Sequence, residues 1–318
     1  MSLIIINTLD LSGAPEAVKE LEAVGKLISL SPERAEILPA LKQGDAYLAN
    51  ARVVIDKEFL DAAPKLKVIG SPSTGTDHMD LAAIDARGIA RFDIAREYEL
   101  IDGFTATSEL VFALTLAVNR HLKAAFPAAE RGDWARDRFT GFQLAGKTLG
   151  VLGLGRLGRI SARIGQGFGM HVIANDIRPV EAPGVRLVDF NALLSEADVL
   201  TVHVHLTPQT ECLIGNGAFA RMKRNAILIN ASRGRIVDES ALLKALKQGL
   251  IAGAGLDVID GEWLSEQERA EHPLVIYARE HGNLVITPHI GGATVESIYG
   301  ARVFMARKVA NFLRKGSA

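Results

Sequence analysis

Residues 148–176 read TLGVL (148–152), GLGRLG (153–158), RISARIGQGFGM (159–170) and HVIAND (171–176). A short apolar run is followed by a glycine turn, a segment with helical spacing, and a second apolar run that ends in an acid. The run from Leu149 to Leu152 is typical of a buried parallel strand. The segment therefore predicts a strand–turn–helix–strand unit of a doubly wound α/β sheet.

The glycine turn has the spacing of a dinucleotide-binding loop. Gly153 suits a tight turn, Gly155 lets the backbone approach a pyrophosphate, and Gly158 lets the helix pack closely on the strand. The N-terminus of that helix would present unpaired amides and the positive end of a helix dipole to the phosphates, and Arg156 beside it would add charge. Asp176 would accept the ribose hydroxyls and repel a 2′-phosphate.

A glycine turn alone is weak evidence, because glycines cluster in many turns that bind nothing. The strand before it, the helix after it and the acid 18 residues beyond Gly158 favour a dinucleotide site. Asp176 favours NAD over NADP. Arg178 is the one residue that points the other way, since an arginine at this place can accommodate a 2′-phosphate.

Composition bounds the remaining choices. The chain has 318 residues, 48% of them hydrophobic and 23% charged, which is enough for two domains with large cores. A formal net charge of −1 gives no overall field that would attract nucleic acid. The single cysteine, Cys212, excludes an intrachain disulfide and suits a reducing compartment; we expect it to be buried, and we expect no metal site.

The N-terminus predicts a strand at residues 3–6 rather than a signal peptide, because no basic region precedes this short apolar run. The densest apolar run, Leu110 to Val118, is interrupted by Thr115 and is too short to span a membrane. We therefore expect a cytoplasmic protein with neither membrane nor nucleic acid as a partner.

The first hundred residues alternate short apolar runs with helical segments and predict an α/β fold with a mostly parallel sheet. The run ending at Gly70 leads into residues 71–77, SPSTGTD, which suit a loop at the ligand-binding edge of a sheet. A plain turn with Asp77 capping the next helix explains the same residues.

A domain junction is expected near residue 100, followed by an apolar helix over residues 108–125. The glycine-turn domain then continues with strands near 199–203, 227–229, 254–256 and 284–286, which gives a sheet of about six strands. A last helix over residues 295–315 is expected to return to the first domain.

Five motifs, in order, resemble the D-isomer-specific 2-hydroxyacid dehydrogenase family over nearly the whole chain, in a form similar to phosphoglycerate dehydrogenases. They are 153–158 with Asp176, HLTPQT at 205–210, INASRG at 229–234, GLDV at 255–258 with Glu262, and TPHIGG at 287–292. The resemblance implies a Rossmann-type NAD domain, residues 100–293, inserted into a split flavodoxin-like substrate domain, residues 1–99 and 294–318. It also implies a cleft between the two domains and a homodimer.

The resemblance assigns the catalytic roles to Arg233, Glu262 and His289. Reduction of a 2-oxo acid leaves negative charge on the carbonyl oxygen, so a proton donor is needed there, and histidine suits that task near neutral pH. A carboxylate on the other ring nitrogen fixes the tautomer, and an arginine provides a planar fork for the substrate carboxylate. Taken singly, the three residues could equally be a surface ion pair, a solvated acid and a structural histidine.

The same resemblance implies further binding positions. Asp257 would reach the nicotinamide carboxamide, and the backbone of residues 73–75 would hold the substrate carboxylate. The implied cofactor contacts are Gly153, Gly155, Arg156, Leu157, Gly158, Asp176, Thr207, Ala231, Asp257 and Gly291. The implied substrate contacts are Arg52, Ser73, Thr74, Gly75 and Arg233.

The chain departs from the family pattern in three places. Many members have Glu-Pro where this chain has Glu262-Trp263, and an acidic insertion follows at residues 264–271. Members that act on 3-phosphoglycerate often have Arg-Ser-Arg where this chain has Asn50, Ala51 and Arg52, so one phosphate-binding charge is missing. A regulatory domain that some members append is not expected after Ala318.

These observations favour an NAD-dependent dehydrogenase that acts on a D-2-hydroxy acid or its 2-oxo acid, with 3-phosphoglycerate as a candidate. The alternative from another class is a non-catalytic NAD-sensing binding protein of the same fold, against which the complete triad argues. A formate dehydrogenase is disfavoured by Glu262, since that group has glutamine there.

Overall fold

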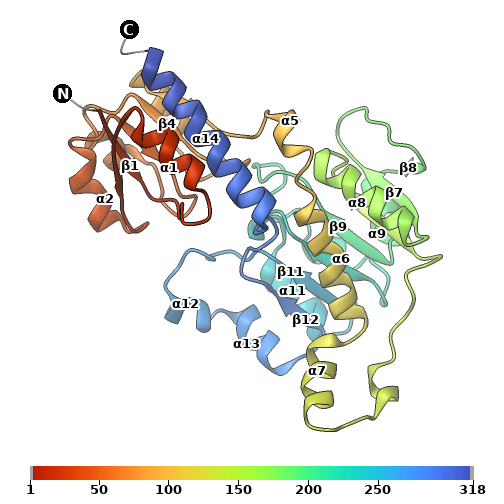
Figure 1. The fold of residues 1–318 in the computed structure, drawn as a ribbon. Coiled ribbons are helices and arrows are strands. Elements are labelled where there is room, and N and C mark those ends of the chain that lie inside the picture. The colour runs from red at the N-terminus through yellow and green to blue at the C-terminus, as the bar shows by residue number, and fades with distance from the viewer. Residues whose placement is uncertain (1–2, 316–318) are drawn as a thin grey trace. The chain divides into compact units, whose positions relative to one another are not determined.

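A computed structural model describes residues 3–315 of the chain, which fold into two compact units (Figure 1). The first unit contains the residues up to Phe104 and those from Ala293 onward, and the second contains Thr105–Gly292. Each unit is built on its own parallel sheet. The predicted α/β class is confirmed.

The first unit has a five-stranded sheet in the order β2-β1-β3-β4-β5. All its pairings are parallel, so the carboxyl ends of its strands lie at one edge. Loops that follow these strands therefore share that edge. The strands are β1 Leu3–Asn7, β2 Gly25–Ser29, β3 Ala46–Leu48, β4 Val68–Gly70 and β5 Ala90–Phe92.

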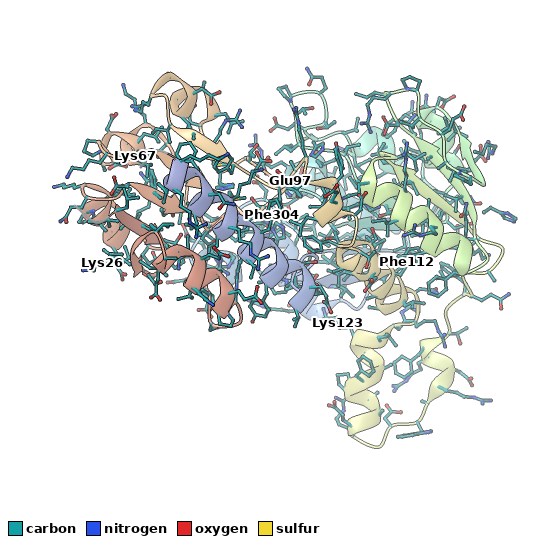
Figure 2. All side chains as sticks on the ribbon, turned by 45° about the horizontal axis from the view of Figure 1, so that its top comes forward. Lys26, Lys67, Glu97, Phe112, Lys123 and Phe304 are labelled. Atoms are coloured by element: carbon teal, nitrogen blue, oxygen red, sulfur yellow. The ribbon has the colours of Figure 1, made fainter. Side chains whose placement is uncertain are left out.

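The last helix of the chain, α14 (Val295–Lys315), belongs to the first unit, as expected. It packs along α1 and against β4, where Gly70 lies close to Met305 and Val309 (Figure 1). Lys308 of α14 pairs with Glu97 and lies 5.6 Å from the centroid of the Phe304 ring. Figure 2 labels Glu97 and Phe304. The other helices are α1 Pro15–Glu22, α2 Arg34–Leu41, α3 Lys57–Asp61, α4 Leu81–Ala86 and α5 Tyr98–Ile101.

The second unit has a seven-stranded parallel sheet in the order β12-β11-β10-β9-β6-β7-β8. One strand more than expected is present, because β8 is only three residues long and mostly exposed, so it lacks an apolar signal. The strands are β6 Thr148–Leu152, β7 His171–Asn175, β8 Val185–Leu187, β9 Val199–Val202, β10 Ile227–Asn230, β11 Gly253–Leu256 and β12 Leu284–Ile286.

The order of these strands reverses between β6 and β9. From β6 the chain continues outward through β7 and β8, and from β9 it continues in the other direction to β12. In sheets of this kind ligands bind outside the carboxyl ends of the strands, at the point of reversal. Gly153 follows β6 directly and lies against the backbone of His203, just beyond β9, so the glycine turn occupies this point.

The predicted helix over residues 108–125 is in fact two helices. Helix α6 (Ala106–Asn119) ends before His121, which has a left-handed φ of 52°, and α7 (Leu122–Glu130) contains Pro127. The stretch from residue 98 to residue 119 has the length and the apolar composition of a membrane-spanning helix. Core helices of globular proteins can meet the same two criteria. Val111, Phe112, Leu114 and Val118 of α6 are core residues of the second unit, which accounts for this apolar character. Figure 2 labels Phe112.

The remaining helices of the second unit connect successive strands. They are α8 Arg156–Gly167, α9 Phe190–Glu196, α10 Asn216–Phe219, α11 Glu239–Lys247, α12 Glu266–Ala270 and α13 Pro273–Glu280, with 3₁₀ turns η1 Arg136–Phe139 and η2 Gly234–Ile236.

Two local expectations were wrong. Cys212 is exposed rather than buried, and it lies in a turn with a left-handed φ of 51°, which hydrophobicity could not reveal. Asp77 does not cap the next helix, because the cap of α4 is Asp80, whose carboxylate accepts a hydrogen bond from the Ala83 amide. The interpretation of residues 71–77 as a plain turn in which Asp77 caps the next helix is therefore wrong.

We predict that His203 makes the fold sensitive to acid. Burial lowers its pKa to about 4, and its Nε2 lies 3.0 Å from Thr201 Oγ1. The unfolded chain binds a proton near pH 6.5, whereas the folded chain resists protonation until about pH 4. Stability should therefore be complete above pH 6.5 and fall as the pH drops toward 4, by up to about 3 kcal/mol.

Urea unfolding between pH 7 and 4 measures this effect. His203→Asn should flatten the decline, while His171→Asn, at an exposed histidine of β7, should leave it unchanged. An identical pH slope in wild type and His203→Asn would show that His203 does not carry the acid sensitivity.

Candidate active site

The glycine turn after β6 forms a close-packed cradle. Gly153 has a φ of +92°, which a side chain would strain, and a Cβ on Gly158 would lie 2.0 Å from the Gly153 carbonyl oxygen. At Gly155 the surroundings are open, since a Cβ there would meet only the Arg178 Nη2 at 3.8 Å. Two of the glycines therefore fold the turn, and the third leaves room beside the start of α8 for a phosphate.

Asp176 lies at the end of β7 and connects this turn to Arg178. Its Oδ2 accepts the Leu154 amide at 2.9 Å, and its Oδ1 accepts the Arg178 amide at 2.9 Å and Nε at 3.1 Å. The bond from the Arg178 side chain is the main cause that lowers the pKa of the Asp176 carboxyl. The sequence analysis considered Arg178 as a residue that could favour NADP, against the preference of Asp176 for NAD. In the structure Arg178 is the ion-pair partner of Asp176.

The other predicted cofactor positions are distributed around the carboxyl edge of the sheet. Arg156 and Leu157 form the first turn of α8, and the Leu157 carbonyl accepts a bond from Ser108 Oγ. Thr207 is exposed, and its amide and hydroxyl bond to Thr210 Oγ1, so this loop after β9 stabilises itself. Ala231 and Gly291 follow β10 and β12 respectively.

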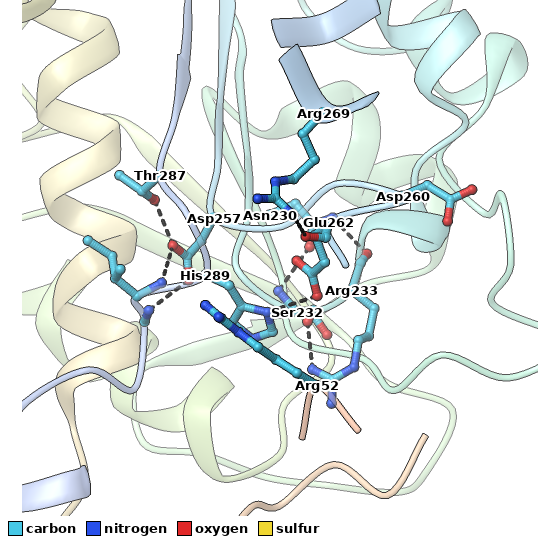
Figure 3. Close-up of polar contacts among 12 residues, drawn as sticks. Arg52, Asn230, Ser232, Arg233, Asp257, Asp260, Glu262, Arg269, Thr287 and His289 are labelled. Carbon is cyan, nitrogen blue, oxygen red and sulfur yellow. Dashed lines mark hydrogen bonds and ion pairs between the residues drawn. The ribbon is translucent and has the colours of Figure 1, made fainter. Parts of the chain in front are cut away.

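Three neighbouring strands are each followed, within three residues, by a predicted functional residue. Arg233 lies three residues beyond β10, Asp257 directly follows β11, and His289 lies three residues beyond β12. Because these strands pair in parallel and in sequence, their carboxyl ends meet at one edge. Figure 3 shows Arg233 near Glu262 and His289 at this edge.

The Asp257 carboxylate organises the loop that carries His289. It is 1% exposed, and it accepts the Thr287 hydroxyl at 2.6 Å, the Ile290 amide at 2.8 Å and the Gly291 amide at 2.7 Å (Figure 3). These bonds surround His289, whose φ of 55° is uncommon for a residue other than glycine. The Asp257 carboxylate thus maintains the strained backbone of His289, the candidate proton donor. The resemblance also implies a contact between Asp257 and the cofactor.

His289 and Glu262 form a direct pair. His289 Nδ1 lies 2.9 Å from Glu262 Oε1, and the two side chains are 33% and 17% exposed (Figure 3). A carboxylate can only accept here, so Nδ1 carries the proton and donates it, and Nε2 is left to exchange a proton with a ligand. The sequence placed these residues 27 apart, and the fold brings them into hydrogen-bond contact.

Sequence reasoning missed Trp263 as a neighbour of His289. Their ring centroids are 5.7 Å apart with an interplanar angle of 30°, and Trp263 is 50% exposed. Its position directly after Glu262 was visible, but a loop of unknown path gave no sign of where the ring would lie.

The predicted substrate residues of the first unit share one sheet edge. Arg52 follows β3 and is exposed, and residues 73–75 follow the adjacent strand β4. Ser73 Oγ donates to the Gly75 carbonyl at 2.8 Å and lies 2.8 Å from Ser71 Oγ, so the loop has a defined shape. Asn50 is used internally, since its Oδ1 accepts the Arg52 amide at 3.0 Å.

Comparison with known proteins agrees with this arrangement. Residues 112–291 match the NAD binding domain of the D-isomer specific 2-hydroxyacid dehydrogenases, and residues 4–97 match their catalytic domain. The chain belongs to this family. The predicted family, fold class and NAD cofactor are confirmed, and the named relatives in this family are oxidoreductases.

Three relatives show the extent of the similarity. A glyoxylate reductase from Thermococcus litoralis is 39% identical over 295 residues, covering 89% of this chain and 85% of the relative. A D-3-phosphoglycerate dehydrogenase from Methanocaldococcus jannaschii is 36% identical over 305 residues, covering 94% of this chain but only 56% of the relative. The crystal structure of a D-lactate dehydrogenase from Aquifex aeolicus, complexed with NAD and lactic acid, is 27% identical and has a TM-score of 0.86, with 98% of this chain and 96% of the other covered.

The residues present fit NAD. A side chain would be strained at Gly153 and would clash at Gly158, whereas the space at Gly155 is open, which is the pattern that a phosphate cradle requires. The Gly155–Arg156 start of α8 and the acid Asp176 would hold the pyrophosphate and the adenosine ribose. When bound, NAD(H) supplies or accepts the hydride.

We predict that His289→Asn lowers kcat by about two to four orders of magnitude, the usual contribution of general acid–base catalysis. Asparagine tolerates the left-handed φ of this position, so the loop should keep its shape. NADH affinity, measured by fluorescence titration, should stay within about threefold of wild type. Unchanged turnover would exclude His289 from the chemistry.

We predict that Asp176→Ala weakens NADH binding and narrows the preference for NADH over NADPH. The variant removes a ribose acceptor and also releases Arg178, which can then pair with a 2′-phosphate. Adding Arg178→Ala should abolish any NADPH gain, because the new partner is lost. The ratio of kcat/KM for the two cofactors is the measurement, and an unaltered ratio in Asp176→Ala would refute the assignment.

Proposed function

We propose that this protein is an NAD-dependent dehydrogenase that interconverts a small 2-oxo acid and its D-2-hydroxy acid. The observation that carries the proposal is the His289–Glu262 pair, 2.9 Å apart, at the strand edge of an NAD binding domain. Arg233, which follows β10 at the same edge, supplies the cation that such a substrate requires.

In the direction of reduction, protonated His289 donates the proton on Nε2 to the substrate carbonyl oxygen while the carbonyl carbon receives the hydride. Glu262 accepts the bond from Nδ1 throughout, so the ring keeps its orientation and its developing charge is balanced. In oxidation the same nitrogen takes the proton of the hydroxyl group. No other proton donor is required for this step.

Arg233 is proposed to bind the substrate carboxylate. Its Nη1 donates to the Ser232 carbonyl at 2.8 Å, and Asn230 Nδ2 donates to the Arg233 carbonyl at 2.9 Å, so both ends of the residue are oriented. A planar guanidinium matches a carboxylate with two parallel bonds and polarises the adjacent carbonyl. We propose the first unit as the substrate domain, with residues 73–75 contributing backbone amides.

For the substrate, we propose an unphosphorylated acid of two or three carbons, such as glyoxylate or hydroxypyruvate. The similarity to the glyoxylate reductase, 39% identical over 295 residues, supports this choice, and Asn50 is uncharged where members that act on 3-phosphoglycerate often have arginine. Trp263 beside His289 also favours this choice, because an indole ring offers no charge to a phosphate.

A phosphorylated substrate, 3-phosphoglycerate, is the second candidate. Arg52 is exposed at the same sheet edge as residues 73–75, where a cation could reach a phosphate. The similarity to phosphoglycerate dehydrogenases supports this candidate as well.

The family resemblance further supports a cytoplasmic homodimer, and light scattering would separate a dimer from a 34.1 kDa monomer.

We predict that purified protein oxidises NADH with glyoxylate and hydroxypyruvate at a kcat/KM at least tenfold above that for 3-phosphohydroxypyruvate. Initial rates at 340 nm against this panel, and with the hydroxy acids and NAD⁺ in reverse, make the comparison. The opposite ranking would favour the phosphorylated substrate. Turnover of none of these acids would favour the non-catalytic NAD sensor.

Arg52→Gln distinguishes the two substrate candidates. A charge-assisted bond to phosphate contributes about 1.5–3 kcal/mol, so its loss would lower kcat/KM for a phosphorylated acid by about 10- to 100-fold. The rates with glyoxylate should change less than about threefold. An equal loss for both kinds of acid would show that Arg52 does not recognise phosphate.

A further inference from the structure

Two side chains restrain the backbone of the loop that carries Glu262: Glu239 of α11 and Arg269 of α12. Its backbone adopts a left-handed conformation directly before the glutamate, at Gly261, which has a φ of +76°. Within the described residues, Glu262 Oε2 is buried and has no hydrogen-bond partner, so the bond that Oε1 accepts from His289 Nδ1 is the one that orients the carboxylate. A displacement of about 1 Å would break that bond.

The first restraint is Glu239, at the start of α11. Its Oε1 accepts the amide of Asp260, two residues before Glu262, at 2.8 Å. Its Oε2 lies 3.0 Å from His272 Nε2, and the two side chains are only 18% and 14% exposed. Burial raises the pKa of the Glu239 carboxyl. The carboxylate thus connects the loop backbone to α11 and to the start of α13.

His272 is oriented by its own backbone contact. Its Nδ1 accepts the Leu274 amide at 3.3 Å at the N-terminus of α13, so Nδ1 carries no proton and Nε2–H donates to Glu239. The histidine therefore fixes the second oxygen of Glu239 while the first restrains Asp260.

The second restraint comes from the acidic insertion itself. Arg269 of α12 donates from Nη1 to the Glu262 carbonyl at 3.3 Å (Figure 3). The same nitrogen also donates to the Leu264 carbonyl. Helix α12 is a single short helix stabilised by a capping box, in which Ser265 and Glu268 bond reciprocally. The guanidinium thus spans the backbone on both sides of Trp263.

We propose that Arg269 and the Glu239–His272 pair are positioning residues that hold the Glu262 carboxylate against His289. The inserted segment is then a clamp for the catalytic pair. The role rests on the proposed function. It predicts an effect on the chemical step through Glu262, rather than on the binding of substrate or NADH.

The test is a double-mutant cycle between Arg269→Met and Glu262→Gln, with hydroxypyruvate as substrate. Arg269→Met retains the side-chain stem and removes the donors, so we expect kcat to fall about 10- to 100-fold. KM and NADH affinity should change less than about threefold. In the Glu262→Gln background the same change should cost less than about twofold, because the group that Arg269 positions is already altered.

Three controls separate positioning from general damage. Arg269→Lys, which keeps one donor, should recover part of kcat. Arg279→Met, at an exposed arginine of the adjacent helix α13, should behave as wild type. Glu239→Gln keeps an acceptor for Asp260 but not for His272 as well, so it should give a smaller loss that also vanishes in the Glu262→Gln background. The melting temperature of each variant shows that it is folded.

A readout independent of turnover is the ¹⁵N NMR spectrum of His289. The clamp predicts that Nδ1 carries the proton in wild type and that Arg269→Met produces a mixture of tautomers. Losses of kcat that add fully in the double variant, together with an unchanged His289 tautomer, would overturn the proposal. A tautomer that responds to Arg269 in a protein that reduces no 2-oxo acid would retain the clamp and reject the proposed function.

Discussion

The buried carboxylate of Asp257 is the interaction on which the candidate active site depends. It is almost fully removed from solvent, and three donors of the 287–291 loop satisfy it. The same bonds maintain the left-handed backbone at His289, which would otherwise cost on the order of 1 kcal/mol or more. Loss of the carboxylate would leave the buried Gly291 amide and the part-buried Ile290 amide without this acceptor, and a buried donor left unsatisfied costs about 1–3 kcal/mol. The position of His289, the candidate proton donor, is therefore determined by Asp257 at the end of the neighbouring strand β11.

The parallel sheet explains how residues that are far apart in the sequence come together in the candidate active site. Strands β10, β11 and β12 pair consecutively, so Arg233, Asp257 and His289, separated by more than twenty residues from one another along the chain, meet at one edge. The glycine turn lies further along the same edge, where the strand order reverses. Glu262 is the exception, because it reaches His289 from a loop rather than from a strand end. That loop is where this chain has additional restraints, from Arg269 and from Glu239.

Much of this could be predicted from the sequence, because strand ends and glycine turns leave local signals. The strand before Gly153, the acid after β7 and the last helix all lie where periodicity and spacing placed them. Side-chain partners in loops could not be predicted in the same way. The Arg178–Asp176 pair, the Trp263–His289 stack and the bond from Glu239 to the Asp260 amide depend on backbone paths that no periodic pattern specifies. The helix that begins after Ser265 was not predicted either, because residues 264–271 were described only as an acidic insertion.

The central claim is that this strand edge supports hydride transfer to a 2-oxo acid with His289 as the proton donor. A single-turnover reaction with hydroxypyruvate and NADH deuterated at C4 of the nicotinamide tests it most directly. The account predicts glycerate of the D configuration with one deuterium at C2 and none at C3, when the transferring face of the nicotinamide carries the label. Deuterium absent from C2 with both labelled faces, or glycerate of the L configuration, would contradict it.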